Sequence, residues 1–165
     1  MSLNQSFIKE LENEAKQTRK VLERVPLDKA DWKPHEKSMA LGRLATHVAE
    51  ISGYITSTLD ADEMDFAKMD YKPRIAKSTS ELLAIFEENY NKGMESLKNA
   101  TDEKMLSNWT MRNGEHVYFT MPKIVVVRSF AFNHLYHHRG QLTVFLRLND
   151  VPLPGVYGPT ADEPM

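Results

Sequence analysis

Apolar residues recur at helical spacing along four stretches of the chain, at about residues 4–24, 39–59, 78–100 and 122–149. In each stretch they return every three or four positions, so they form one apolar stripe along a helix. The stripes of the first three stretches are Phe7, Leu11, Ala15, Thr18 and Leu22; Leu41, Leu44, Val48, Ile51 and Ile55; and Leu82, Phe86, Tyr90 and Leu97. The pattern predicts four amphipathic helices.

The ends of these helices carry the signals expected of helix ends. Pro26 follows the first helix and stops it, and Ser38 can cap the second. Ser78 stands three residues before Glu81 and shortly before an apolar pair, which is the capping box of a helix start. Pro122 is tolerated in the first turn of the fourth helix, whose apolar centre suits the middle of a bundle.

Two of the segments between the helices have a recognisable character. Residues 60–77 are polar and contain Pro73, so we expect a long connection that carries the chain from one end of a bundle to the other. Residues 109–120 alternate between apolar and polar positions and contain Asn113-Gly114. That dipeptide favours a tight turn, so this segment predicts a small two-stranded hairpin.

We interpret the whole chain, residues 1–165, as one all-α domain. Four amphipathic helices with one long crossover, and with a small hairpin between the third and fourth helices, suggest a four-helix bundle. The proline-rich tail, residues 151–165, should form an irregular strap over its surface. The alternative is a generic helical domain with another packing order.

The composition excludes several classes of protein. Lys and Arg number 21 against 23 Asp and Glu, and the sequence shows no basic stripe, so we do not expect a nucleic-acid partner. The chain has no cysteine, so a metal ion would be held by nitrogen and oxygen, and a thiol would have to come from a substrate. Because the sequence shows neither a signal core nor a membrane span, we expect a cytoplasmic protein without a membrane partner.

Two histidines of the fourth helix are spaced to share a ligand. His134 and His138 are four residues apart and therefore lie on one face of the helix, about one turn from each other. Zinc and related ions bind imidazole nitrogens at about 2.0–2.1 Å, which two such rings can supply. The pair continues the stripe of Val127, Ala131 and Phe145, so it should point inward. By itself, however, this spacing is a weak signal.

His47 strengthens the case because it comes from the second helix. It shares a face with Leu44 and Ile51, which puts it on the core side. A buried imidazole without a partner is costly, so His47 needs one. It could simply bond a backbone carbonyl or a tyrosine, but two inward histidine positions on two long helices predict one shared ion held by His47, His134 and His138.

Some roles stay open at this point. His137 could replace His138 only if the pair were turned about 100° around the helix, so we expect His137 at the rim or behind the ligands. Gln141 could orient a ligand ring or touch substrate, and Glu50 could be an acceptor behind His47, a general base or a solvated residue. His35 and His116 lie in predicted loops, where solvated surface residues are expected.

Three imidazoles leave room for chemistry on the ion. Closed structural zinc sites usually have four protein ligands, whereas catalytic sites keep a position for water or substrate. Water on such an ion reaches a pKa of about 7, and a substrate thiol would be bound as thiolate. The alternatives are a non-catalytic metal-binding module that dimerises or docks a partner, and a metal-free helical domain whose histidines are only packed.

Several motifs together resemble the DinB family, also called DinB/YfiT-like metalloenzymes. The matching motifs are Trp32-Lys33-Pro34-His35, Leu44-Ala45-Thr46-His47, His134-x3-His138-Arg139-Gly140-Gln141 and Val151-Pro152-Leu153-Pro154-Gly155-Val156-Tyr157-Gly158-Pro159. The resemblance implies a four-helix bundle in the up-down-down-up arrangement, with a divalent ion, zinc or nickel, on His47, His134 and His138. It thereby selects His138 over His137.

The resemblance also implies a range of activities and a homodimer. Some relatives are thiol-dependent transferases or isomerases, and some are hydrolase-like. We therefore expect a metal-dependent transferase that uses a low-molecular-weight thiol, or a metal-dependent hydrolase, acting on a small molecule. A non-catalytic metal-binding helical dimerisation module is the alternative.

Overall fold

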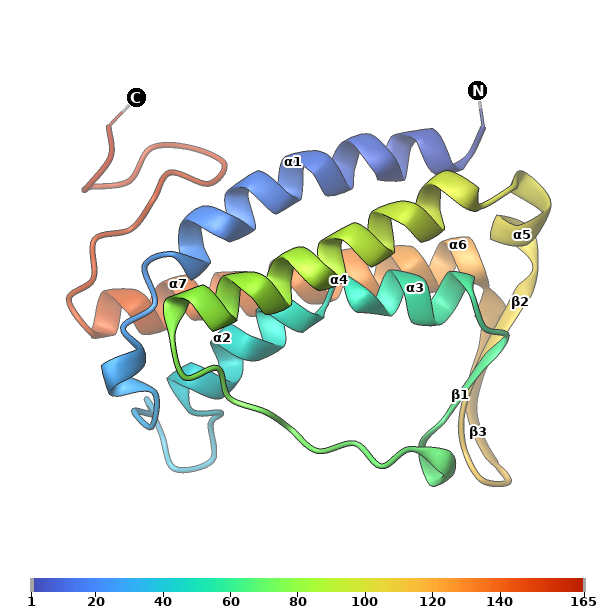
Figure 1. Ribbon diagram of the computed structural model, residues 1–165, viewed down its shortest axis with the longest axis horizontal. Coiled ribbons are helices and arrows are strands. Elements are labelled where there is room, and N and C mark those ends of the chain that lie inside the picture. Colours follow the sequence, from blue (N-terminus) through green and yellow to red (C-terminus); the bar gives the residue numbers. More distant parts are fainter. Residues whose placement is uncertain (1, 165) are drawn as a thin grey trace.

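The chain folds into helices that run along one direction, with a small three-stranded sheet at one end (Figure 1). The structure is a computed structural model that describes residues 2–164. Its α-helices are α1 (Asn4–Leu22), α2 (Leu41–Glu50), α3 (Gly53–Leu59), α4 (Thr79–Asn99), α5 (Asp102–Leu106), α6 (Lys123–Val126) and α7 (His134–Leu148). The remaining elements are the 3-10 helices η1 (Leu27–Lys29) and η2 (Phe66–Lys68), the π-helix η3 (Val127–Asn133), and the strands β1 (Glu63–Asp65), β2 (Asn108–Asn113) and β3 (His116–Pro122).

The described residues form more separate helices than the four that the sequence pattern predicts. The second predicted helix is divided into α2 and α3 by a turn at Ile51 and Ser52. Both residues keep right-handed helical dihedral angles, so the division is a bend and the apolar stripe continues through it. Ile51 and Ile55 are both buried. The fourth predicted helix is a continuous run of α6, η3 and α7.

The predicted signals at Ser78 and at Asn113-Gly114 are confirmed, but the predicted cap at Ser38 is wrong, because α2 begins at Leu41 with Ala40 as its N-cap residue and without a side-chain cap. The Ser78 hydroxyl accepts a hydrogen bond from the Glu81 backbone N–H at 3.1 Å, and α4 begins at the next residue. Strands β2 and β3 pair in antiparallel fashion around a turn in which Gly114 has a φ of 59°. A residue with a side chain rarely adopts that angle, which is why glycine occupies this turn.

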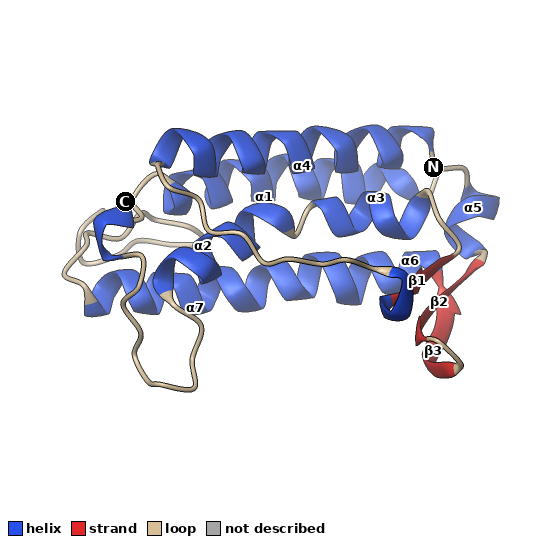
Figure 2. Cartoon of the chain, turned by 60° about the horizontal axis from the view of Figure 1, so that its bottom comes forward, coloured by secondary structure: helices blue, strands red, loops and turns tan. Residues whose placement is uncertain are grey.

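Strand β1 was not predicted, because it is only three residues long and lies inside the polar connection. It pairs in parallel with β2 and makes the hairpin a three-stranded sheet. The Asp65 carboxylate accepts hydrogen bonds from the backbone N–H of Gly114 at 2.9 Å and of Ala67 at 3.1 Å. These bonds fix the start of the connection against the tip of the hairpin. The chain then runs on to α4 as an extended segment on one side of the helices (Figure 2).

Two large apolar clusters form the core between the helices. One cluster joins residues of α1, α2, α4 and α7, and the other joins residues of α1, α3, α4 and η3. The predicted stripes of α1 and of α2–α3 are buried throughout. Tyr54 packs against both clusters and therefore marks the place where they meet. Within residues 2–164, none of the helices combines the length and the apolar character that crossing a bilayer requires.

The tail is an irregular strap as far as Pro164, as predicted, and Met165 lies outside the described residues. It is attached by ion pairs of Glu163 with Arg24, which follows α1, and of Asp162 with Arg147 in α7. These contacts hold the tail across the ends of α1 and α7.

Candidate metal centre

His47, His134 and His138 come together although 87 residues separate the first two. One candidate ligand atom from each ring lies within 4.8 Å of the other two. The Nε2 atoms of His47 and His134 are 3.1 Å apart, and the centroids of the three rings are 4.6 to 4.9 Å apart. The structure thus brings together the three histidines that the sequence selects.

Each histidine is placed by its own element. His47 lies on the buried stripe of α2 and is itself only 8% exposed. His134 is the first residue of α7, directly after the π-helix η3, and His138 follows one turn later. Short π-helical segments occur often at functional sites, because their wider turns re-aim the side chains that follow.

The predicted stripe along the fourth helix is correct only in part. Val127 and Ala131 are buried, but the buried line of α7 consists of Leu135, Arg139, Leu142 and Leu146. His134 and His138 lie beside this line and are half-buried. The period of 3.6 residues does not hold across η3, so the sequence spacing misplaces the stripe. As a result, the pair faces His47 from the edge of the core and not from within it.

Groups behind the rings set which nitrogen faces the centre. The Nδ1 atom of His138 lies 2.7 Å from Oε1 of Gln141, and the Nδ1 atom of His134 lies 3.3 Å from the Phe130 carbonyl oxygen. Both oxygens can only accept, so each Nδ1 carries the proton and each Nε2 keeps its lone pair. Metal-binding histidines are commonly oriented in this way. Of the two roles considered for Gln141, the structure therefore supports the orienting one.

All three rings are held neutral. Burial, followed by the neighbouring charges of His138 and His134, lowers the pKa of His47 to about 3. Burial is also the main cause that lowers the pKa of His134 and of His138. A metal ion binds the neutral imidazole, so the three rings are in the required state near pH 7 without losing a proton.

The residues fit a divalent ion. With nitrogen ligands at 2.0–2.1 Å in a tetrahedron, two ligand atoms are about 3.3 Å apart, close to the 3.1 Å between the two Nε2 atoms. The buried Nδ1 of His47 has no hydrogen-bond partner among the described residues. An ion bound to Nε2 would leave this Nδ1 unpaired as well, so the fit rests on the spacing of the Nε2 atoms.

An aromatic wall, which the sequence pattern does not predict, borders the histidines. The Tyr54 ring stacks on His134 with centroids 5.7 Å apart and planes 11° apart, and Phe130 packs on Tyr54 at 4.8 Å. Burial raises the pKa of Tyr54, so its phenol stays protonated and can donate a hydrogen bond. Its spacing of seven residues from His47, two helical turns, is the signal that could have found it.

Charged groups border the histidines on α2. Arg43 precedes His47 by one turn, and its Nη1 lies 3.0 Å from the Glu50 carboxylate. Glu50 also forms an ion pair with Arg74 at 3.5 Å. Two arginines thus engage the carboxylate of Glu50, whose side chain is 21% exposed, and among the described residues Glu50 does not accept a hydrogen bond from Nδ1 of His47.

The other histidines lie apart from the group of three. His137 is exposed, and its ring centroid is 4.8 Å from that of His138. It therefore lies at the rim, as the sequence suggests. His35 and His116 are exposed as well, as expected, although His116 belongs to β3 and not to a loop.

Comparisons with known proteins agree with this fold. The sequence model of the DinB family matches residues 1–164. The uncharacterized protein YrdA of Bacillus subtilis (strain 168) is 29% identical over 157 residues, which cover 95% of this chain and 89% of YrdA.

Two solved structures have a similar fold. A DinB-like protein from Bacillus cereus ATCC 10987 has a TM-score of 0.69 at 22% identity, over 92% of this chain and 95% of its own. The DinB-like protein YjoA from Bacillus subtilis has a TM-score of 0.71 at 17% identity, over 92% of this chain and 97% of its own. The match of the family along nearly the whole sequence shows that this chain belongs to the DinB family.

Proposed function

We propose that the chain is a metal-dependent enzyme in which His47, His134 and His138 hold one divalent ion, zinc or nickel. The observation that carries the proposal is the group of three neutral imidazoles with ligand atoms within 4.8 Å of one another. Within residues 2–164 this group includes no carboxylate, so three protein ligands would leave a position for a small molecule.

The chemistry proposed for this centre is transfer to or from a low-molecular-weight thiol, or hydrolysis of a small molecule. When bound, the ion would supply Lewis-acid chemistry and lower the pKa of a coordinated water or thiol. Gln141 and the Phe130 carbonyl hold two of the rings in the tautomer that such an ion needs. The protonated phenol of Tyr54 is available as a hydrogen-bond donor beside His134.

We also propose that α2 with α3, and α6 with η3 and α7, each act as one helix, so that the chain is one four-helix-bundle domain in the up-down-down-up order. The bend between α2 and α3 and the continuity of the last three elements support this. The homodimer that the family resemblance implies and the cytoplasmic location expected from the sequence remain proposals.

Metal content tests the ion site. Protein made without a histidine tag and dialysed against zinc or nickel should retain close to one ion per chain, measured by inductively coupled plasma mass spectrometry. A triple variant, His47→Ala with His134→Ala and His138→Ala, should retain none, while His137→Ala should behave as the wild type. Equal metal content in the wild type and the triple variant would overturn the site.

Turnover tests the enzyme. The metal-loaded protein should act on a thiol with an electrophile such as 1-chloro-2,4-dinitrobenzene, or on a panel of esters and amides, well above the triple variant. A stoichiometric ion without turnover in either panel would favour the non-catalytic metal-binding module. The ion pairs of Glu50 with Arg43 and Arg74 favour the non-catalytic module, because they engage the carboxylate that is the nearest candidate for a general base.

A further inference from the structure

Arg43 is a cation placed beside the three histidines. It lies on the same face of α2 as His47, one turn before it, and its side chain is only 16% exposed. Because His47 belongs to the group of three histidines, the guanidinium lies next to the centre that they share.

The partners of Arg43 leave it with an uncompensated charge. Its Nη1 donates to Glu50 at 3.0 Å and to the Arg74 carbonyl oxygen at 3.3 Å, and its Nη2 donates to the Tyr71 hydroxyl at 2.6 Å. Glu50 is shared with the Arg74 guanidinium. Two guanidinium groups thus face one carboxylate, and the other two partners are neutral.

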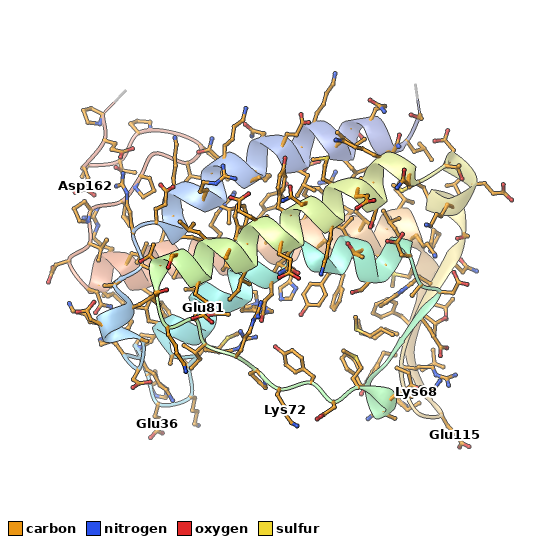
Figure 3. All side chains as sticks on the ribbon, in the orientation of Figure 1. Glu36, Lys68, Lys72, Glu81, Glu115 and Asp162 are labelled. Atoms are coloured by element: carbon orange, nitrogen blue, oxygen red, sulfur yellow. The ribbon has the colours of Figure 1, made fainter. Side chains whose placement is uncertain are left out.

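The neutral partners come from the exposed connection between η2 and α4. Residues 69–75 of this connection are exposed, and Tyr71 is 56% exposed. Figure 3 shows side chains of α2, α3 and the connection directed toward one another, while Lys72 on the connection points away from the helices. Lys72 pairs with Asp70 at 2.9 Å and takes no part in the contacts of Arg43.

We propose that Arg43 determines the specificity of this centre by binding the carboxylate of a small anionic substrate whose other end reaches the ion. This inference rests on the proposed function and names the class of its substrate. A guanidinium matches a carboxylate in a two-bonded fork, which a hydroxyl or a carbonyl oxygen cannot replace. The substrate carboxylate replaces the Tyr71 hydroxyl and the Arg74 carbonyl oxygen as the acceptor of hydrogen bonds from the Arg43 guanidinium.

The competing explanation is that Arg43 only fastens the connection to α2 through Glu50, Tyr71 and Arg74. The two explanations differ in what they predict for Glu50. If Arg43 serves as a fastener, Arg43→Gln and Glu50→Gln break the same ion pair and change ligand binding in the same direction. If Arg43 binds the substrate anion, Glu50 competes for it, so the two variants change anion binding in opposite directions.

Thiol probes on the cobalt-loaded protein separate these outcomes. Cobalt(II) accepts the same nitrogen ligands as zinc and gives an absorption band when a thiol binds it. We compare 3-mercaptopropionate with 3-mercapto-1-propanol, which lacks the carboxylate, and follow the band during titration. The wild type should bind the acid about tenfold more tightly than the alcohol, the factor expected for one charge-assisted hydrogen bond.

The variants sharpen the test. Arg43→Gln should lose the preference for the acid and keep its affinity for the alcohol. Arg43→Lys should keep a reduced preference for the acid, and Glu50→Gln should increase that preference above the wild-type value. Arg19→Gln is the matched control, because it removes a helical arginine paired with Glu87 of α4, and its preference should equal that of the wild type. Retention of one cobalt ion by each variant shows that it is folded.

The failures of the two proposals are distinguishable. Absence of stoichiometric cobalt in the wild type would overturn the metal centre and this inference with it. Bound cobalt with equal affinity for the two thiols in the wild type would overturn the role of Arg43 alone. A loss of the preference for the acid in both Arg43→Gln and Glu50→Gln would also overturn the role of Arg43 in substrate binding. It would show that Arg43 only fastens the connection to α2.

Discussion

At the scale of single residues, His47 is the least satisfied member of the histidine group. Without an ion, the 3.1 Å contact between the Nε2 atoms of His47 and His134 requires one proton. Because the Phe130 carbonyl fixes the proton of His134 on Nδ1, that proton belongs to Nε2 of His47. The buried Nδ1 of His47 then lacks a donor among the described residues. The metal-free fold thus contains a buried imidazole with one nitrogen unsatisfied.

This burial makes the stability of the metal-free protein depend on pH. The pKa of His47 is lowered to about 3, whereas in the unfolded chain it returns to about 6.5. Between these values the unfolded state binds the extra proton, so the free energy of unfolding falls as the pH falls from about 6.5 toward about 3. At about pH 5.5 the loss should be about 1 kcal/mol, which allows for solvent screening.

Urea denaturation of the metal-free wild type and of His47→Gln measures this dependence. The free energy of unfolding should decrease more steeply on acidification in the wild type than in the variant, because glutamine does not titrate. His35→Gln, which removes an exposed histidine, should follow the wild type. Parallel curves for the wild type and His47→Gln would show that burial of this ring does not penalise its charged form.

The sequence predicts the positions of the three histidines but not the groups that complete the site. Spacing alone places His134 and His138 on one helical face, and the inward face of α2 adds His47. Arg43 and Tyr54 lie one and two turns from His47, but neither residue type by itself indicates that the side chain borders a metal centre. Their role depends on which sides of α2 and α3 remain open, and that is decided by tertiary packing.

At the scale of elements, Gly93 decides how closely α4 approaches the bend between α2 and α3. A Cβ atom on Gly93 would lie 2.7 Å from the Ser52 carbonyl oxygen and 3.5 Å from Cβ of Ile55. The first of these atoms is backbone, so it cannot rotate away. Glycine is therefore required at this crossing, although it lowers the intrinsic stability of a helix.

Gly93→Ala should destabilise the fold by about 1–3 kcal/mol, because overpacking must displace backbone at the bend. Gly140→Ala is the matched control, since Gly140 also lies within a helix but has nothing within 4 Å of its added Cβ. That variant should gain up to about 1 kcal/mol from improved helix propensity. Urea unfolding measures both, and an equal change in the two variants would contradict the steric explanation.

Elements are predictable from the sequence where local signals are strong. The Ser78 cap and the turn at Gly114 both form, because each depends only on neighbouring residues, although the Glu81 carboxylate accepts from the Lys77 backbone N–H and not from that of Ser78. The bend at Ser52 was not predicted, because the apolar stripe continues through it. The π-helix η3 was not predicted either, because the spacing of apolar residues was interpreted with 3.6 residues per turn along the whole segment. Strand β1 exists only because β2 is there to pair with it.

At the scale of the whole molecule, one buried ion pair connects parts of the chain far apart in sequence. The Arg139 guanidinium donates to the Glu14 carboxylate at 2.5 Å and to the Thr18 hydroxyl at 3.0 Å. The Tyr157 hydroxyl donates to the same carboxylate at 2.6 Å. Helix α1, helix α7 and the tail thus meet at one polar cluster, on the helix that also carries His134 and His138. This cluster is not predictable from the sequence, because the partners of Arg139 come from distant segments.

Breaking this ion pair should therefore weaken the whole fold. Both charged side chains are at most 6% exposed, so Glu14→Gln leaves a buried cation without its counter-charge and should cost about 3 kcal/mol in urea unfolding. Replacing both partners, as in Glu14→Leu with Arg139→Met, removes both buried charges and should cost less than Glu14→Gln alone. Tyr157→Phe should cost only about 1 kcal/mol, because it removes hydrogen bonds but no charge. If the double variant were the least stable of the three, the pair would stabilise the fold through packing and not through charge compensation.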